Sequence, residues 1–146
     1  MVPPGTLAYS SGMPFQILLA EDNQTFANSV SRFVGLISGA QLVGHAKDGD
    51  EALEKAVALT PDLILMDIAM PKQSGLQVAQ QLQLLAHPSR IVFLSMHSDA
   101  SYREAARKAG GLHFVTKANF VAELLPLIEQ MMSEKPLPPV TTERAD

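Results

Sequence analysis

Carboxylates end two of the apolar segments of this 146-residue chain. Asp67 closes the run 63–66, and Glu21 and Asp22 follow the run 15–20. An isolated Asp in such a place often serves only as a turn or capping residue. Three carboxylates brought together would repel one another, and some would bind protons unless a cation lay among them. A hard divalent ion such as Mg²⁺, which prefers oxygen ligands and keeps several waters, would meet that need.

Two further polar side chains stand at the ends of later apolar segments. Ser95 ends the run 90–95, and Lys117 follows the run 112–116. A lysine ammonium is a mobile point charge suited to a phosphoryl oxygen, and a hydroxyl can also donate to one. Asp67 is then the candidate nucleophile, because carboxylates attack phosphoryl groups and form aspartyl phosphates. The chemistry depends on a fold that brings these residues together.

Apolar runs alternate with helical patterns along the chain. Short runs bounded by turn residues indicate buried parallel strands, and apolar residues three or four apart indicate helices. The segments expected as strands are 15–20, 40–46, 63–67, 90–95 and 112–116. The residues expected to face the core from the first three helices are Phe26, Val30, Phe33, Val34 and Ile37, then Ala52, Leu53, Ala56 and Val57, then Leu76, Ala79, Leu82 and Ala86. A fourth helix is expected over 99–109, and a fifth contains Pro126, which should kink it.

Five strands alternating with five helices predict an α/β fold with a parallel sheet and helices on both faces. For a sheet of this size we expect the flavodoxin-like (βα)5 three-layer sandwich with strand order 2-1-3-4-5. That order places the first and third strands side by side. Glu21, Asp22 and Asp67 would then meet in one crevice at the carboxyl edge of the sheet.

Composition limits the classes of function. The chain has 11 Lys and Arg against 15 Asp and Glu, a net charge of -4, and no basic run, which argues against direct nucleic-acid binding. Cysteine is absent, which excludes disulfides, thiolate metal sites and a cysteine nucleophile. The apolar stretches fall short of the roughly 18 residues of a membrane span. We therefore expect a soluble, cytoplasmic protein.

The length suits one folded domain, expected over 14–132. Residues 1–13 are rich in Pro, Gly and Ser and predict a loose lead-in. Residues 133–146 contain three prolines and predict a linker or tail.

Over about residues 15–132 the chain resembles the receiver domain of two-component response regulators. The resemblance rests on the acidic pair Glu21-Asp22, on Asp67 followed by Pro71 and Gly75, on Ser95 at a strand end, and on Lys117 after Ala109-Gly110. It implies that Asp67 accepts a phosphoryl group from a sensor histidine kinase or a phosphotransfer protein. Such a domain catalyses its own phosphorylation and dephosphorylation and has no separate substrate, so we do not expect an ordinary enzyme.

The same resemblance implies roles for the surrounding residues. Glu21, Asp22 and Asp67 would hold Mg²⁺, or Mn²⁺ in its place, together with the backbone carbonyl of Ala69. Lys117 would contact the phosphoryl group.

The resemblance also implies a conformational switch made of Ser95 and Phe114. The helix over 99–109 offers mainly alanines to the core, so it should bury little apolar surface and move at low cost. We expect phosphorylation to draw Ser95 inward and to let Phe114 and this helix repack.

Details near the switch are similar to the subfamily whose receivers precede a LuxR/NarL-type helix-turn-helix effector, namely Leu94-Ser95-Met96-His97 and Gly110-Gly111. DNA would then be contacted only through an effector outside this chain. A stand-alone receiver or pseudo-receiver that acts through protein binding is the alternative. Apolar residues in excess on the last helix suggest either a homodimer contact or packing against another domain.

Several features depart from the family pattern or fit other classes less well. Phe114 replaces the commoner Tyr, and Ala118 stands where many receivers have Pro. A haloacid-dehalogenase-type phosphatase would need a second Asp where Ala69 stands, and a nucleotide-binding module would need a Gly-rich phosphate loop. The four histidines lack metal-ligand spacing, although His97 is a candidate to overhang the site.

Overall fold

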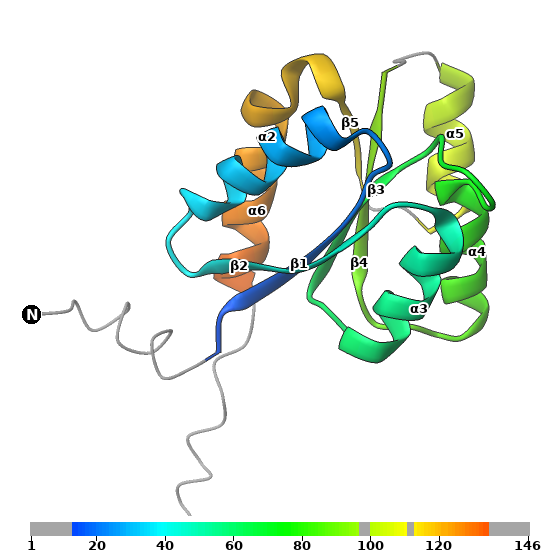
Figure 1. Ribbon diagram of the computed structural model, residues 1–146, viewed down its shortest axis with the longest axis horizontal. Helices are drawn as coiled ribbons and strands as arrows, with labels where there is room; N and C mark the ends of the chain where they lie inside the picture. Colours follow the sequence, from blue (N-terminus) through cyan, green and yellow to red (C-terminus); the bar gives the residue numbers. More distant parts are fainter. Residues whose placement is uncertain (1–12, 97–99, 111–112, 135–146) are drawn as a thin grey trace, which may run out of the picture.

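The computed structural model describes residues 13–96, 100–110 and 113–134. Within them five strands form one parallel sheet in the order β2-β1-β3-β4-β5 (Figure 1). The strands are β1 (Phe15–Ala20), β2 (Ala40–Ala46), β3 (Leu63–Asp67), β4 (Arg90–Ser95) and β5 (His113–Thr116). The helices are α2 (Gln24–Gly35), α3 (Gly49–Leu59), α4 (Gly75–Leu84), α5 (Ala100–Lys108) and α6 (Phe120–Glu134). The predicted flavodoxin-like fold and strand order are confirmed.

Helices cover both faces of the sheet, with α2 and α6 on one face and α3, α4 and α5 on the other (Figure 1). Because strand residues alternate between faces, β1 divides between two cores. Ile17 and Leu19 belong to the core with α2 and α6, whereas Leu18 and Ala20 belong to the other core. The central strands are thus buried on both sides, which explains why they read as unbroken apolar runs.

Capping residues start three helices at the carboxyl edge of the sheet. The Asn23 and Asp48 side chains accept hydrogen bonds from the third backbone N–H of α2 and α3. Ser74 and Gln77 form a reciprocal capping box at the start of α4. Each such cap stabilises its helix by about 1 kcal/mol and fixes where the preceding loop ends.

Two expectations about inward-facing helix residues are wrong. Val57 is 52% exposed, because α3 buries only a narrow stripe of small residues that includes Ala52 and Ala56. Ala86 lies beyond the end of α4 and is exposed. Its φ of 54° closes the helix in the left-handed conformation, and the His87 N–H donates to Leu82 O at 2.9 Å, as in a Schellman motif.

The carboxyl-terminal part of the fold begins with a short 3-10 turn, Lys117–Asn119, between β5 and α6. Pro126 lies inside α6 as expected, while the kink stays a prediction. The peptide bonds of the described residues, Lys117-Ala118 included, are trans.

Three sequence expectations concern residues outside the described part of the chain. These are the position of His97, nearly all of the lead-in predicted over 1–13 and most of the tail predicted over 133–146, and the corresponding domain boundaries stay predictions. None of the helices in the described ranges combines the length and the apolar character needed to cross a membrane.

Candidate functional site

The predicted carboxylates meet at the carboxyl edge of the sheet. β1 and β3 are neighbours, with Ala20 paired to Met66, so the residues that follow leave the sheet side by side. Glu21, Asp22 and Asp67 each offer an oxygen, and these atoms lie within 4.8 Å of one another. Glu21 has no solvent exposure, Asp67 is 4% exposed, and Asp22 is exposed. The cluster therefore combines two buried acids with one that solvent reaches.

Lys117 completes the cluster from the first position of the 3-10 turn. Its Nζ lies 2.8 Å from Glu21 Oε1 and 3.3 Å from Asp67 Oδ2, and its side chain is 10% exposed. The Glu21 Oε2 atom accepts a hydrogen bond from the Asn23 N–H at 3.0 Å, whereas the buried Oε1 atom is met by the Lys117 ammonium. Three carboxylates whose oxygens lie this close together are a donor set that suits a hard divalent cation, because the charge of Lys117 alone does not balance them.

The surroundings of Asp67 disfavour its charged form. Burial, followed by the charge of Glu21, raises the pKa of Asp67 from 3.8 to about 7. A hydrogen bond with the Asp22 side chain also raises this pKa, while the Lys117 ammonium and the Ala69 N–H, which donates to Oδ1 at 3.2 Å, lower it. Without a cation, Asp67 would be partly protonated at neutral pH, so a bound cation would increase the fraction of nucleophilic carboxylate.

Gly75 allows the loop after Asp67 to fold back on the strand. A Cβ atom at this position would lie 2.2 Å from the Asp67 backbone oxygen. The Gly75 N–H donates to Ile68 O at 2.8 Å, and the Ile68 N–H donates to Leu94 O at 3.1 Å. The spacing between Asp67 and Gly75 thus has a steric reason in this fold.

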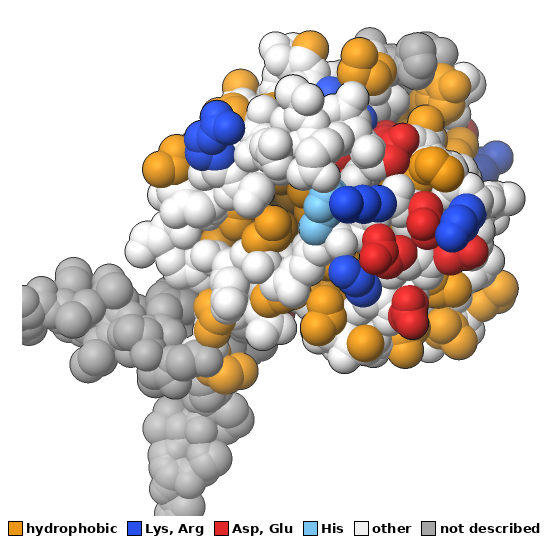
Figure 2. All heavy atoms as spheres, viewed as in Figure 1, with side chains coloured by type: hydrophobic (Ala, Val, Ile, Leu, Met, Phe, Trp, Pro, Cys, Tyr) orange, Lys and Arg blue, Asp and Glu red, His pale blue; other side chains and the backbone are white. Residues whose placement is uncertain are grey.

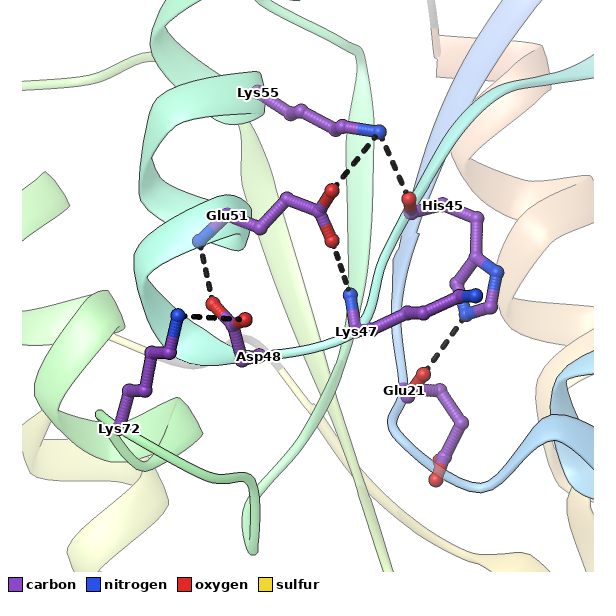
Figure 3. Close-up of polar contacts among 7 residues, drawn as sticks. All are labelled: Glu21, His45, Lys47, Asp48, Glu51, Lys55 and Lys72. Atoms are coloured by element: carbon purple, nitrogen blue, oxygen red, sulfur yellow. Dashed lines mark hydrogen bonds and ion pairs between the residues drawn. The ribbon is translucent and has the colours of Figure 1, made fainter.

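A set of contacts ties the same loop to the start of α3. The Asp48 carboxylate caps α3 and lies 3.5 Å from Lys72 Nζ (Figure 3). The Gly49 N–H donates to Pro71 O at 3.1 Å. A Cβ atom on Gly49 would lie 2.2 Å from Gln73 O. Lys72 has a φ of 71°, a conformation that non-glycine residues rarely adopt. These contacts fix the loop that carries Ala69.

His45 supports the acidic loop from β2. Its Nε2 lies 2.8 Å from the backbone oxygen of Glu21, and the Lys55 ammonium donates to the His45 backbone oxygen at 3.0 Å (Figure 3). His45 is one of the four histidines without metal-ligand spacing, and a single histidine in a strand gives no indication in the sequence that it contacts this loop. The strand pairing that positions it becomes visible only in the structure.

The predicted switch residues lie on the two strands that follow β3 in the sheet, Ser95 at the end of β4 and Phe114 in β5. Ser95 is 4% exposed and ends β4, the strand beside β3. Phe114 is half-buried and packs against the core on the α3, α4 and α5 side. The guanidinium of Arg103 in α5 lies 5.0 Å from the centroid of the Phe114 ring. The structure thus brings the side chains of Glu21, Asp22, Asp67 and Lys117 together in one cluster. Among the described residues, the Phe114 ring contacts Arg103 of α5 rather than a residue of this cluster.

Phe26 is a site neighbour that sequence reasoning treated only as a core residue. Its ring centroid lies 4.9 Å from Lys117 Nζ. Its place in the first turn of the helix after the acidic pair is the sequence feature that could have pointed to it.

Comparisons with known proteins agree with this geometry. Residues 17–129 match the family model of the response regulator receiver domain. The transcriptional regulatory protein PdtaR of Mycobacterium tuberculosis is 32% identical over 133 residues, which are 91% of this chain and 63% of PdtaR. The response regulator GacA of Pseudomonas viridiflava is 32% identical over 114 residues, which are 77% of this chain and 53% of GacA. The chain thus spans less than two thirds of either relative.

Solved structures show the same similarity. The response regulator domain of Thermotoga maritima CheB matches with a TM-score of 0.75 and 29% identity, over 84% of this chain and 99% of that one. A LuxR-family two-component response regulator from Aurantimonas sp. SI85-9A1 matches with a TM-score of 0.77 and 26% identity, over 89% of this chain and 94% of that one. Given the family model, the fold and the acidic cluster, the chain belongs to the response regulator receiver domain family.

Proposed function

We propose that Asp67 is the phosphoacceptor of a two-component system, taking its phosphoryl group from a sensor histidine kinase or a phosphotransfer protein. The observation that carries the proposal is the convergence of Glu21, Asp22, Asp67 and Lys117 within contact distance at one sheet edge. Membership of the receiver family supports the same role.

The transfer exchanges one bond to phosphorus for another. A carboxylate oxygen of Asp67 attacks the phosphorus, and the bond between phosphorus and the donor imidazole nitrogen breaks. Its electron pair stays on that nitrogen, which takes up a proton. Reversal of the signal follows when water attacks the phosphorus, which releases inorganic phosphate and restores the carboxylate. The chain acts on itself in both steps and turns over no separate substrate.

The residues of the cluster have different proposed roles in the transfer. Glu21, Asp22 and Asp67, with the backbone carbonyl of Ala69, are proposed to hold Mg²⁺ or Mn²⁺, which would neutralise charge on the transferring phosphoryl oxygens. Lys117, whose ammonium already lies 3.3 Å from Asp67 Oδ2, would turn toward a phosphoryl oxygen. The fixed loop after Asp67 supports this arrangement, because it keeps Ala69 beside the carboxylate.

We further propose that phosphorylation changes the positions of Ser95, Phe114 and α5. The Ser95 hydroxyl at the end of β4 would move toward the phosphoryl group, and Phe114 would repack under α5. The half-buried Phe114 ring, held on one side by Arg103, supports this proposal, since a partly packed ring can change place at modest cost.

The output of the switch is proposed to be transcriptional. PdtaR is a transcriptional regulatory protein, and the second solved relative belongs to the LuxR family, so a DNA-binding effector in a longer protein fits the similarity. On the face shown in Figure 2, acidic and basic side chains are interspersed, which supports DNA contact through an effector alone. A stand-alone or pseudo-receiver that binds proteins is the second candidate. We also propose a cytoplasmic location and a homodimer contact.

The experiment is incubation of the purified chain with acetyl phosphate and Mg²⁺, followed by intact-mass spectrometry. The proposal expects the added mass of one phosphoryl group, and none when EDTA replaces Mg²⁺. A wild-type chain that gains no phosphoryl mass with any small phosphodonor would support the pseudo-receiver instead.

A further inference from the structure

The Lys117 ammonium has a third neighbour besides its two carboxylates. It lies over the ring of Phe26, 4.9 Å from the ring centroid. A cation at this distance from an aromatic face is attracted by the ring quadrupole, and the attraction grows when water is excluded. The Lys117 side chain is only 10% exposed, so the contact is largely desolvated.

The ring itself is held in place by two helices. Phe26 lies in the first turn of α2, where its N–H donates to the capping side chain of Asn23 at 2.9 Å. Its ring meets the ring of Phe120, the first residue of α6, edge to face, with centroids 5.1 Å apart. Phe120 meets Phe33 of α2 in the same manner at 5.5 Å. Phe120 follows the turn that carries Lys117, so the aromatic cluster anchors both the ring and the lysine backbone.

The Lys117 side chain needs such a support once a divalent cation binds to the carboxylates. The flexible four-carbon stem has many rotamers, and its ammonium is strongly hydrated when free. If a divalent cation takes the oxygens of Glu21 and Asp67, the present partners of Lys117 are shared or lost. The Phe26 ring carries no charge and does not compete for the cation, so it stays available to the ammonium.

We propose that Phe26 is a positioning residue, whose ring face holds the Lys117 ammonium inside the site, ready for the phosphoryl group. The inference rests on the proposed function of Asp67 and adds a residue that acts through Lys117. The contact between the Phe26 ring and the Lys117 ammonium then increases the rate of phosphoryl transfer to Asp67, in addition to any contribution of the ring to packing.

Three variants separate the electrostatic role from packing. Phe26→Leu removes the ring and keeps an apolar side chain. Phe33→Leu is the matched control, because Phe33 belongs to the same helix and the same aromatic cluster but meets Phe120 rather than Lys117. A trifluorinated phenylalanine introduced at position 26 keeps the ring shape and weakens its negative face.

Two measurements on these variants test the role of Phe26. In the wild type, the ring current of Phe26 should shift the ε-methylene protons of Lys117 upfield in NMR spectra, and Phe26→Leu should abolish that shift while Phe33→Leu keeps it. Phosphorylation by acetyl phosphate with saturating Mg²⁺ should slow about three- to tenfold in Phe26→Leu and in the fluorinated protein. Phe33→Leu should keep the wild-type rate despite a similar loss of thermal stability.

A failure of the proposed function of Asp67 can be distinguished from a failure of the proposed role of Phe26. A wild-type chain that takes up no phosphoryl group would overturn the proposed function together with this inference. Normal phosphorylation of wild type with unchanged rates in the fluorinated protein would overturn only the role of Phe26, as would equal slowing by Phe26→Leu and Phe33→Leu.

Discussion

The Lys117 ammonium lies closer to Glu21 than to the proposed phosphoacceptor. Its Nζ is 2.8 Å from Glu21 Oε1 and 3.3 Å from Asp67 Oδ2, and Glu21 has no solvent exposure. In the absence of a divalent cation, Lys117 is therefore the main charge that compensates a fully buried carboxylate. The stability of the chain and its chemistry are coupled through this one side chain.

Loss of that compensation should destabilise the chain. Lys117→Met leaves Glu21 buried without a cation, and breaking a buried pair in this way costs about 3 kcal/mol of unfolding free energy. Urea unfolding in EDTA, followed by circular dichroism, measures the difference. Lys108→Met is the control, because Lys108 is 70% exposed and its ion pair with Glu104 is 4.0 Å long, so the change should stay below about 0.5 kcal/mol. Equal effects of the two substitutions would contradict the coupling.

Asp67 should make stability fall as pH rises. Its pKa in the folded chain, about 7, lies above the ordinary value of 3.8, so between these values the folded chain retains a proton that the unfolded chain releases. The contribution is fully present below the unfolded-state pKa and is lost as pH rises through the folded-state pKa. In EDTA, Asp67→Asn should remove this slope and exceed wild type above pH 7 by on the order of 1 to 2 kcal/mol.

Denaturant titrations at several pH values test this expectation. Wild type in excess Mg²⁺ is the control, since a bound cation lowers the pKa of its ligand and should flatten the slope. A variant that is less stable than wild type above pH 7 in EDTA would show that Asp67 is not under electrostatic strain.

Gly75 should tolerate no side chain. The added methyl group of Gly75→Ala would meet the Asp67 backbone oxygen at 2.2 Å, so strand β3 or helix α4 would have to shift. We expect a loss of about 2 to 3 kcal/mol in unfolding free energy and slower phosphorylation, because the displaced atoms adjoin the nucleophile. Gly35→Ala is the matched control, because no atom outside its chain neighbours and the nearby helix backbone lies within 4 Å of the added methyl, and a gain of up to about 1 kcal/mol is expected from helix propensity.

The structure explains which features the sequence predicts. The bounds of β3 and β4 follow from apolar runs that end in Asp67 and Ser95, because strands buried on both faces require such runs. The convergence of Glu21 and Asp67 follows from strand order alone. Both features depend on local pattern and topology, which a sequence carries directly.

Other contacts depend on how distant segments align. His45 reaches the Glu21 carbonyl because the pairing of β1 with β2 shifts register and skips Val43, and such a shift reverses which face a side chain occupies. The contact of Phe26 with Lys117 depends on how α2 and the turn before α6 pack against each other. Neither alignment leaves a periodic signal in the sequence.

The switch should be visible without covalent chemistry. Beryllofluoride with Mg²⁺, which imitates a bound phosphoryl group, should change the amide chemical shifts of Phe114 and of α5, and relaxation dispersion should show exchange there before its addition. Asp67→Asn should show none of these changes. Unaltered shifts at Phe114 and along α5 in the wild-type chain would mean that the signal leaves the domain by another face.

The identity of the phosphorylated residue tests the central claim most directly. After reaction with acetyl phosphate and Mg²⁺, borohydride reduction converts an aspartyl phosphate to homoserine, and peptide mass spectrometry then locates it. The account predicts homoserine at position 67 alone, with its yield abolished in Asp67→Asn. Modification at Asp22, or an unmodified Asp67 in a chain that has gained phosphoryl mass, would contradict it.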